Sequence, residues 1–153
     1  YLSYAPGSLT SAYAGRVADR VGRRPVLPIA CAALLVGLLL TAAQPLWVFM
    51  AGMVVFSGAF FAVHSLASGW VVARAAAGGG GIGQASAFYL VAYYAGSSVF
   101  GGLAGPAWTG GGWSAVLVLT GALVVTGLGL SWWLTRIPAL SDPPTEGPGV
   151  AAY

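Results

Sequence analysis

The chain has 153 residues, of which 58% are hydrophobic and only 6% are charged, whereas a soluble domain carries about 25% charged residues. Six basic and three acidic side chains give a net charge of +3, and the mean hydropathy is +0.85. A soluble fold with so little charge could not cover its surface with polar groups. The composition therefore excludes an ordinary cytosolic enzyme, a nucleic-acid-binding module and a disordered tail, and it indicates an all-α integral membrane protein. Cys31 is the only cysteine, so no intrachain disulfide framework is expected.

The first segment, 1–14, is apolar to small, but it is shorter than the roughly 20 residues that a helix needs to cross a bilayer. Pro6 and Gly7 are expected to interrupt it. It begins without Met and lacks the charged first region and the cleavage site of a signal peptide. We expect it to be the end of a partial transmembrane span in a fragment of a larger protein.

The next segment, 15–25, reads GRVADRVGRRP and holds four of the six arginines. Asp19 is its only acid, so an ion pair with a neighbouring arginine is expected. Gly15 would let a helix end approach a neighbour, and Gly22 permits backbone angles that other residues avoid. These features predict a tight cytoplasmic loop whose arginines meet anionic lipid headgroups. On charge alone, a plain positive-inside anchor explains the same residues.

This segment resembles the signature loop of the major facilitator superfamily, Gly-x-x-x-Asp-Arg-x-Gly-Arg-Arg. In that family the loop joins the second and third spans and recurs between the eighth and ninth. The resemblance implies a conformational switch, in which the acid and its arginines hold the cytoplasmic helix ends together in one state and release them in another. The matching positions are Gly15, Asp19, Arg20, Gly22, Arg23 and Arg24.

Four long apolar stretches follow the signature segment. They are too long for β-barrel strands and do not alternate in polarity, so each is expected to be a transmembrane helix. With the partial span, they would form part of the twelve-helix, two-half bundle that the resemblance implies. The predicted helices are about 26–43, 46–73, 85–108 and 113–135.

Counting these four spans places all six arginines on one face of the membrane, which the positive-inside rule makes cytoplasmic. The connections 44–45 and 109–112 on the other face carry no charge. The tail 136–153 is rich in Pro and is expected to be disordered and cytoplasmic. The tryptophans agree with an aromatic belt at each boundary: Trp47, Trp108 and Trp113 at the outer one, and Trp70, Trp132 and Trp133 at the inner one.

His64 is the ionisable side chain deep within a predicted span. Such a residue suggests a proton relay or a substrate contact. A neutral histidine that is hydrogen-bonded to a serine of its own helix, or to a neighbouring helix, is the structural alternative. Tyr93 and Tyr94 lie in the following span and are able to line a cavity for an amphipathic substrate. No Asp or Glu lies in any predicted span, so proton coupling is also expected in the part of the protein outside this chain.

Small residues recur four apart at Ser97, Gly101 and Gly105, a spacing that allows close helix approach. Gly105 and Pro106 are expected to bend or end that helix. The run resembles the Gly-x-x-x-Gly-Pro segment of spans five and eleven in the efflux branch of the superfamily, which is linked there with antiport. The match is incomplete, because the following glycine pair is displaced by one residue and Ala92 stands where the family has glycine. Ordinary helix packing remains the alternative.

The resemblance as a whole implies the C-terminal half of a bacterial drug- or sugar-efflux permease, spans eight (partial) to twelve, in the inner membrane with a cytoplasmic C-terminus. Spans two to six are the internal alternative. The expected partners are the lipid bilayer, the N-terminal half of the same transporter, a small-molecule substrate and protons. No cofactor, metal, catalytic residue or nucleic acid is expected.

Two other function classes compete with a transporter. A non-transporting membrane scaffold, or the inactive remnant of a transporter, would share the same composition. An intramembrane hydrolase would use His64 with Ser97 or Ser98, but no orienting acid or amide accompanies them. Substrate, coupling ion and direction of transport are not determined by the sequence.

Overall fold

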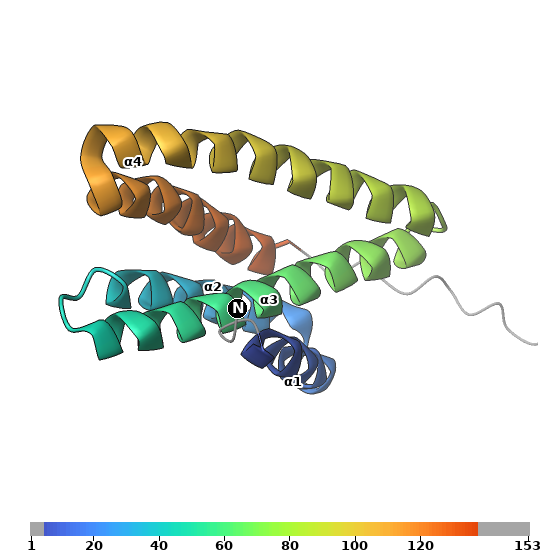
Figure 1. Cartoon of the computed structure of the whole chain (residues 1–153). Coiled ribbons are helices and arrows are strands. Elements are labelled where there is room, and N and C mark those ends of the chain that lie inside the picture. The colour runs from blue at the N-terminus through green and yellow to red at the C-terminus, as the bar shows by residue number, and fades with distance from the viewer. Residues whose placement is uncertain (1–4, 138–153) are drawn as a thin grey trace, which may run out of the picture.

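The computed structural model describes residues 5–137, with side-chain surroundings from Thr10 onward. Within these residues every element is a helix, and no strand occurs, so the all-α prediction is confirmed. Three of the helices, α2, α3 and α4, are long and apolar enough to cross a membrane. The elements in chain order are α1 (Ala5–Val21), α2 (Arg23–Leu40), α3 (Leu46–Ala77) and α4 (Ile82–Thr135) (Figure 1).

Helix α4 is broken at Gly112, where φ is 61° and ψ is −151°. Figure 1 shows the chain reversing there, so that a first arm (82–111) and a second arm (113–135) run antiparallel. Side chains with a Cβ rarely adopt this backbone conformation, which glycine tolerates. The reversal lies in the uncharged segment 109–112 that the sequence predicts as a connection.

Two sites that contain proline do not interrupt their helices as expected. Pro6 and Gly7 lie in the first turn of α1, where backbone N–H groups have no intrahelical acceptor in any case. The first arm of α4 continues through Gly105 and Pro106 and ends only at Gly112. Of the two expectations for Gly105 and Pro106, a bend or an end of the helix, the end is therefore wrong. A membrane helix tolerates the loss of the one backbone hydrogen bond that proline cannot form.

The segment 15–25, expected as a loop, is almost entirely helical. Helix α1 runs to Val21 and α2 begins at Arg23, so Gly22, with a φ of 93°, is the only break between them. The Gly22 amide donates to the Ala18 carbonyl at 2.9 Å and satisfies the last turn of α1. Ala and Arg are good helix formers, and a helix surface solvates arginines as well as a loop does, so the charges did not require a loop.

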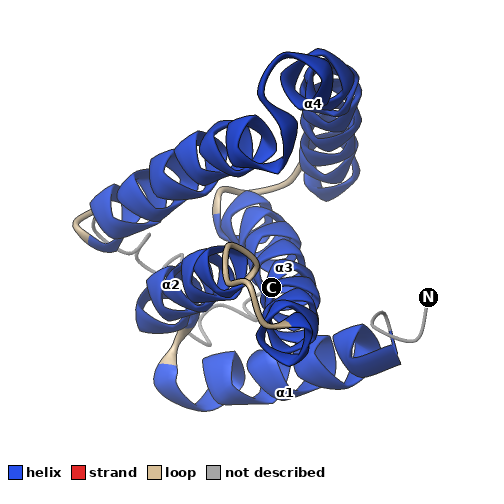
Figure 2. Ribbon diagram, turned by 60° about the vertical axis from the view of Figure 1, so that its left-hand side comes forward, coloured by secondary structure: helices blue, strands red, loops and turns tan. Residues whose placement is uncertain are grey.

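Helix α3 is the centre of the packed part of the molecule and contacts α1 on one side and α2 on the other (Figure 2). One buried cluster joins these three helices, and a second joins α2 and α3 to the second arm of α4. The first arm contributes no buried residue. The first cluster contains Ala14, Ala18, Leu27, Ala30, Ala62 and Leu66, and the second contains Leu34, Leu38, Ala59 and Val124.

Helices α2 and α3 approach each other closely at two glycines. A Cβ added at Gly37 would lie 2.5 Å from the backbone nitrogen of Phe56. A Cβ added at Gly52 would lie 2.9 Å from the carbonyl oxygen of Gly37. Both glycines are buried, so they allow the two backbones to pack without intervening side chains.

The two ends of the bundle differ in chemistry. At one end, the Trp113 indole N–H donates to the Thr41 carbonyl at 2.9 Å, and the Trp113 ring lies 5.9 Å from the Phe49 ring. These contacts join the end of α2, the start of α3 and the reversal of α4. The opposite end carries Arg23 at the start of α2, and Arg74 in the last turn of α3. Arginines thus lie at one end, and the Trp113 contacts join the helices at the other.

Candidate functional site

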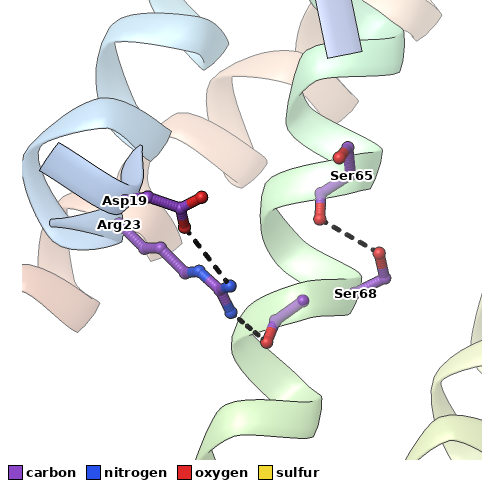
Figure 3. Close-up of polar contacts among 5 residues, drawn as sticks. Asp19, Arg23, Ser65 and Ser68 are labelled. Carbon is purple, nitrogen blue, oxygen red and sulfur yellow. Dashed lines mark hydrogen bonds and ion pairs between the residues drawn. The ribbon is translucent and has the colours of Figure 1, made fainter. Parts of the chain in front are cut away.

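Arg23, the first residue of α2, contacts the end of α1 across the Gly22 break and also contacts the neighbouring helix α3. Its Nη2 lies 4.0 Å from Oδ1 of Asp19, and its Nη1 donates to the Gly69 carbonyl (Figure 3). The Asp19 side chain is 71% exposed, so this ion pair is weakened by solvent. The hydrogen bond to the Gly69 carbonyl joins α2 directly to α3.

The absence of a side chain at Gly69 leaves room for the arginine in this position. A Cβ there would lie 3.1 Å from the Arg23 Nη1 and 3.3 Å from its Cζ. The other positions of the signature segment are less engaged within the described residues. Arg20 is exposed. A Cβ at Gly15 would meet no atom within 4 Å, so the expected close approach of a neighbour at Gly15 is not found there.

His64 forms its contacts with the first arm of α4. The Tyr89 hydroxyl lies 3.0 Å from His64 Nδ1 and 3.3 Å from the His64 carbonyl oxygen. When Nδ1 is unprotonated it accepts from the tyrosine, and the other ring nitrogen then carries the hydrogen. When Nδ1 carries a hydrogen, it donates to the tyrosine, and the hydroxyl is able to donate to the carbonyl oxygen. The pair therefore accommodates both states of the imidazole.

The expected serine partners do not hold His64. The Ser68 hydroxyl donates instead to the Ser65 carbonyl at 3.1 Å (Figure 3). Tyr93 packs on the imidazole with ring centroids 4.8 Å apart, whereas Tyr94 is 63% exposed and touches Tyr93. The structure therefore brings together two of the three predicted residues, His64 and Tyr93.

Sequence reasoning did not select Tyr89 as the partner of His64. The available signal was spacing, since Tyr89 precedes Tyr93 by one helical turn and so shares its face. The described residues do not form the hydrolase arrangement, since His64 contacts Tyr89 and Tyr93 instead of a serine. The Ser97 hydroxyl donates to the Tyr94 carbonyl at 3.0 Å, and both Ser97 and Ser98 are exposed.

One cavity connects the signature segment with the histidine cluster. It has a volume of about 510 Å³ and lies between the start of α2, the second half of α3 and the start of the first arm of α4. Its polar wall combines a guanidinium, an imidazole, a phenol and two serine hydroxyls, and its apolar wall comes from small and branched side chains. The lining residues are Arg23, His64, Ser68, Gly69, Val72, Ala73, Ser86, Tyr89 and Leu90. We refer to it below as the Arg23 cavity.

The predicted packing face on the first arm has no neighbour within the described part of the chain. Gly101 and Gly105 are exposed, and a Cβ at either position would meet nothing within 4 Å. Pro106 is exposed as well. Large apolar side chains on the same arm are equally uncovered, with Phe88 74% and Val91 65% exposed.

The family model of the Major Facilitator Superfamily matches residues 1–152. The chain therefore belongs to this family of membrane transporters, as its signature segment and apolar helices indicate.

Two relatives show how the chain compares with whole members of the family. The uncharacterized MFS-type transporter YybF of Bacillus subtilis (strain 168) is 36% identical over 140 residues, which are 92% of this chain and 34% of the relative. The inner membrane transport protein YnfM of Escherichia coli (strain K12) is 42% identical over 127 residues, which are 83% of this chain and 30% of the relative. The chain thus spans about a third of the length of these relatives. No solved structure matches it.

Proposed function

We propose that the whole protein is a secondary active transporter that exports a small molecule by alternating access, and that this chain supplies its C-terminal spans, eight (partial) to twelve. The observation that carries the proposal is the position of Arg23. It ties α2 to α3 through the Gly69 carbonyl and also lines the Arg23 cavity. A contact that holds two helices together beside a binding cavity is the kind of element that a transport cycle needs to break and remake.

In the proposed cycle, the Asp19–Arg23–Gly69 contact holds the Arg-rich ends of α1, α2 and α3 together in one state. Withdrawing the guanidinium from the Gly69 carbonyl frees α3 to shift against α2. The exposed Asp19 carboxylate then keeps the arginine close to its position without burying an unpaired charge. Arg20 and Arg24 face the headgroup region and fix the depth of these helix ends.

Antiport is the mode of transport that the Gly-x-x-x-Gly-Pro resemblance implies for this protein, and protons are the coupling ion that we propose. Within residues 5–137, Asp19 is the only acid and lies outside the apolar spans. Coupling in this chain would therefore rest on His64 and its partner Tyr89, and the remainder of the protein offers a second location for it.

The test is transport by the full-length protein reconstituted in liposomes under an imposed pH gradient, with a panel of small organic solutes. Saturable solute movement that requires the gradient supports the proposal. A folded, membrane-inserted protein that moves no solute would instead support the scaffold or remnant alternative.

The proposed orientation places the arginines on the cytoplasmic face of the bacterial inner membrane. A relative named as an inner membrane transport protein and the gathering of arginines at one end of the helices support it. Single cysteines at positions 16, 74 and 136 should resist membrane-impermeant maleimides in intact cells, with a cysteine at position 110 as the labelled control. Labelling at any of the three arginine positions would contradict this orientation.

A further inference from the structure

The charge of the Arg23 cavity suggests the class of molecule that it binds. Arg23 is the formally charged side chain in its wall, and within the described residues no carboxylate lines it. Asp19 is not part of the wall, lies 4.0 Å from the guanidinium, and is mostly exposed. It therefore neutralises the arginine only partly, and the cavity keeps a positive electrostatic potential.

The wall offers several hydrogen-bond donors to a ligand. A guanidinium has five N–H groups, and the contacts with Gly69 and Asp19 leave others for a ligand. While His64 Nδ1 accepts from Tyr89, the Nε2 of the same ring carries a hydrogen. The Ser86 hydroxyl adds a third donor on the first arm of α4. Anionic oxygens accept several such bonds at once, and these charge-assisted bonds are the strong ones.

The rest of the wall suits an apolar body. Val72 and Leu90 face the cavity from α3 and from the first arm, and both are partly exposed. We propose that the Arg23 cavity binds an anionic group, a carboxylate or phosphate, that is attached to an apolar body. This inference rests on the proposed function and deepens it, since it makes the exported molecule an organic anion.

The test is equilibrium binding to the full-length protein in phosphatidylcholine nanodiscs. The probes are radiolabelled 2-naphthoate and the smaller benzoate, with 2-naphthalenemethanol and 2-naphthylmethylamine as neutral and cationic matches. We expect the naphthoate to bind saturably and at least tenfold more tightly than its two matches. Arg23→Gln should weaken it at least tenfold, whereas Arg24→Gln, which removes a neighbouring charge outside the wall, should change it less than twofold. Equal affinity for the three naphthyl probes, no binding of either carboxylate, or equal effects of the two arginine variants would overturn the proposal.

A second variant keeps the test decisive if Arg23→Gln fails to fold. Ser86→Asp adds a carboxylate to the opposite wall without touching the link between α2 and α3. It should abolish naphthoate binding and allow 2-naphthylmethylamine to bind, with folding checked by size-exclusion chromatography. Naphthoate affinity unchanged in Ser86→Asp would overturn the proposal on its own.

Two further measurements identify the source of the anionic group and distinguish failure of this proposal from failure of the proposed function. If phosphatidylglycerol in the nanodiscs displaces naphthoate, the anionic group is a lipid headgroup, and the substrate assignment is overturned while the anion site stands. Binding of naphthoate without transport of any solute in liposomes would remove the proposed function alone. Transport of the cation ethidium with no naphthoate binding would remove the anion site alone.

Discussion

Two pairs of helical glycines in this chain have opposite surroundings. Gly37 and Gly52 lie where α2 and α3 meet, and a Cβ at either would come within 3 Å of the neighbouring backbone. Gly101 and Gly105 lie on the first arm of α4, where a Cβ would meet nothing. Composition alone does not distinguish the two sets.

The difference shows which surfaces this chain completes by itself. Helices α1, α2 and α3 and the second arm of α4 bury clusters of apolar residues between them, whereas the first arm buries none. Lipid tails are as apolar as leucine, so a bare apolar arm is compatible with a membrane, but small residues gain nothing from contact with lipid. Because the chain spans about a third of its relatives, the rest of the protein is the expected neighbour of Gly101 and Gly105.

The packed pair should be the most sensitive to substitution. In the full-length protein, Gly37→Ala places a methyl group against the Phe56 backbone, which cannot rotate away as a side chain can. Overpacking of this kind lowers the free energy of unfolding by about 1–3 kcal/mol. Thermal unfolding in detergent measures it, and Gly129→Ala is the matched control, since that glycine is helical and has open space around it. Equal melting temperatures for the two variants would show that α2 and α3 do not pack as described.

The exposed glycines, Gly101 and Gly105, test whether the rest of the protein covers the first arm of α4. Gly101→Leu and Gly105→Leu should reduce transport by the full-length protein severalfold, because a bulky side chain would block the neighbour that we expect on this face. Gly83→Leu on the same arm is the control, since its position is helical and open. Gly80 lies in the preceding loop but is a poor control, because its φ of 142° would strain any other residue. Equal transport by Gly101→Leu, Gly105→Leu and Gly83→Leu would contradict the assignment of a packing face to the first arm.

Much of the fold could be predicted from the sequence because long apolar runs leave few choices in a membrane. The helical class and the connection at 109–112, where the chain reverses, followed from the lengths of the apolar runs. The helical state of 15–25 did not, since charge density suggested a loop while the backbone had good helix formers. The expectation that Pro106 bends or ends its helix was wrong as to the end, because an isolated proline does not always end a membrane helix.

The candidate site was predicted less well, since it depends on which faces meet in three dimensions. The ion pair between Asp19 and an arginine is local in sequence, and it was predicted. The bond from Arg23 to the Gly69 carbonyl joins two helices through a backbone atom, which no side-chain pattern reveals. Tyr89 was missed as the partner of His64 for a different reason: spacing puts it on the same face as Tyr93, but the rotation of α4 about its axis decides which of the two reaches the imidazole nitrogen.

Loss of the Asp19–Arg23 contact at the start of α2 should lower stability less than substitution of the packed glycines does. It should nevertheless reduce transport clearly. Asp19→Asn removes a solvent-weakened ion pair, so the free energy of unfolding should fall by less than about 1 kcal/mol. Transport should fall more, since a state-dependent contact is on the scale of about 1–3 kcal/mol of coupling. Uptake in liposomes and melting in detergent measure the two effects, and Asp19→Glu, which keeps the carboxylate, should restore transport. Wild-type transport by Asp19→Asn would leave the segment as a charge anchor only.

The smallest effect is expected at the hydrogen bond that ties the packed helices to the bare arm. His64→Gln keeps an acceptor for Tyr89 and a donor toward the Arg23 cavity but cannot take up a proton. We expect both the transport rate and its dependence on pH to be preserved, because coupling carboxylates are expected in the part of the protein outside this chain. His64→Leu removes the ring acceptor, yet the Tyr89 hydroxyl keeps the backbone carbonyl of residue 64 at 3.3 Å, so the loss of stability should stay near 1 kcal/mol or below. The measurement is the transport rate between pH 5.5 and 8.5. If His64→Gln and Tyr89→Phe each flatten this pH profile, the expectation is wrong, and the His64–Tyr89 pair is the coupling site between α3 and the first arm of α4.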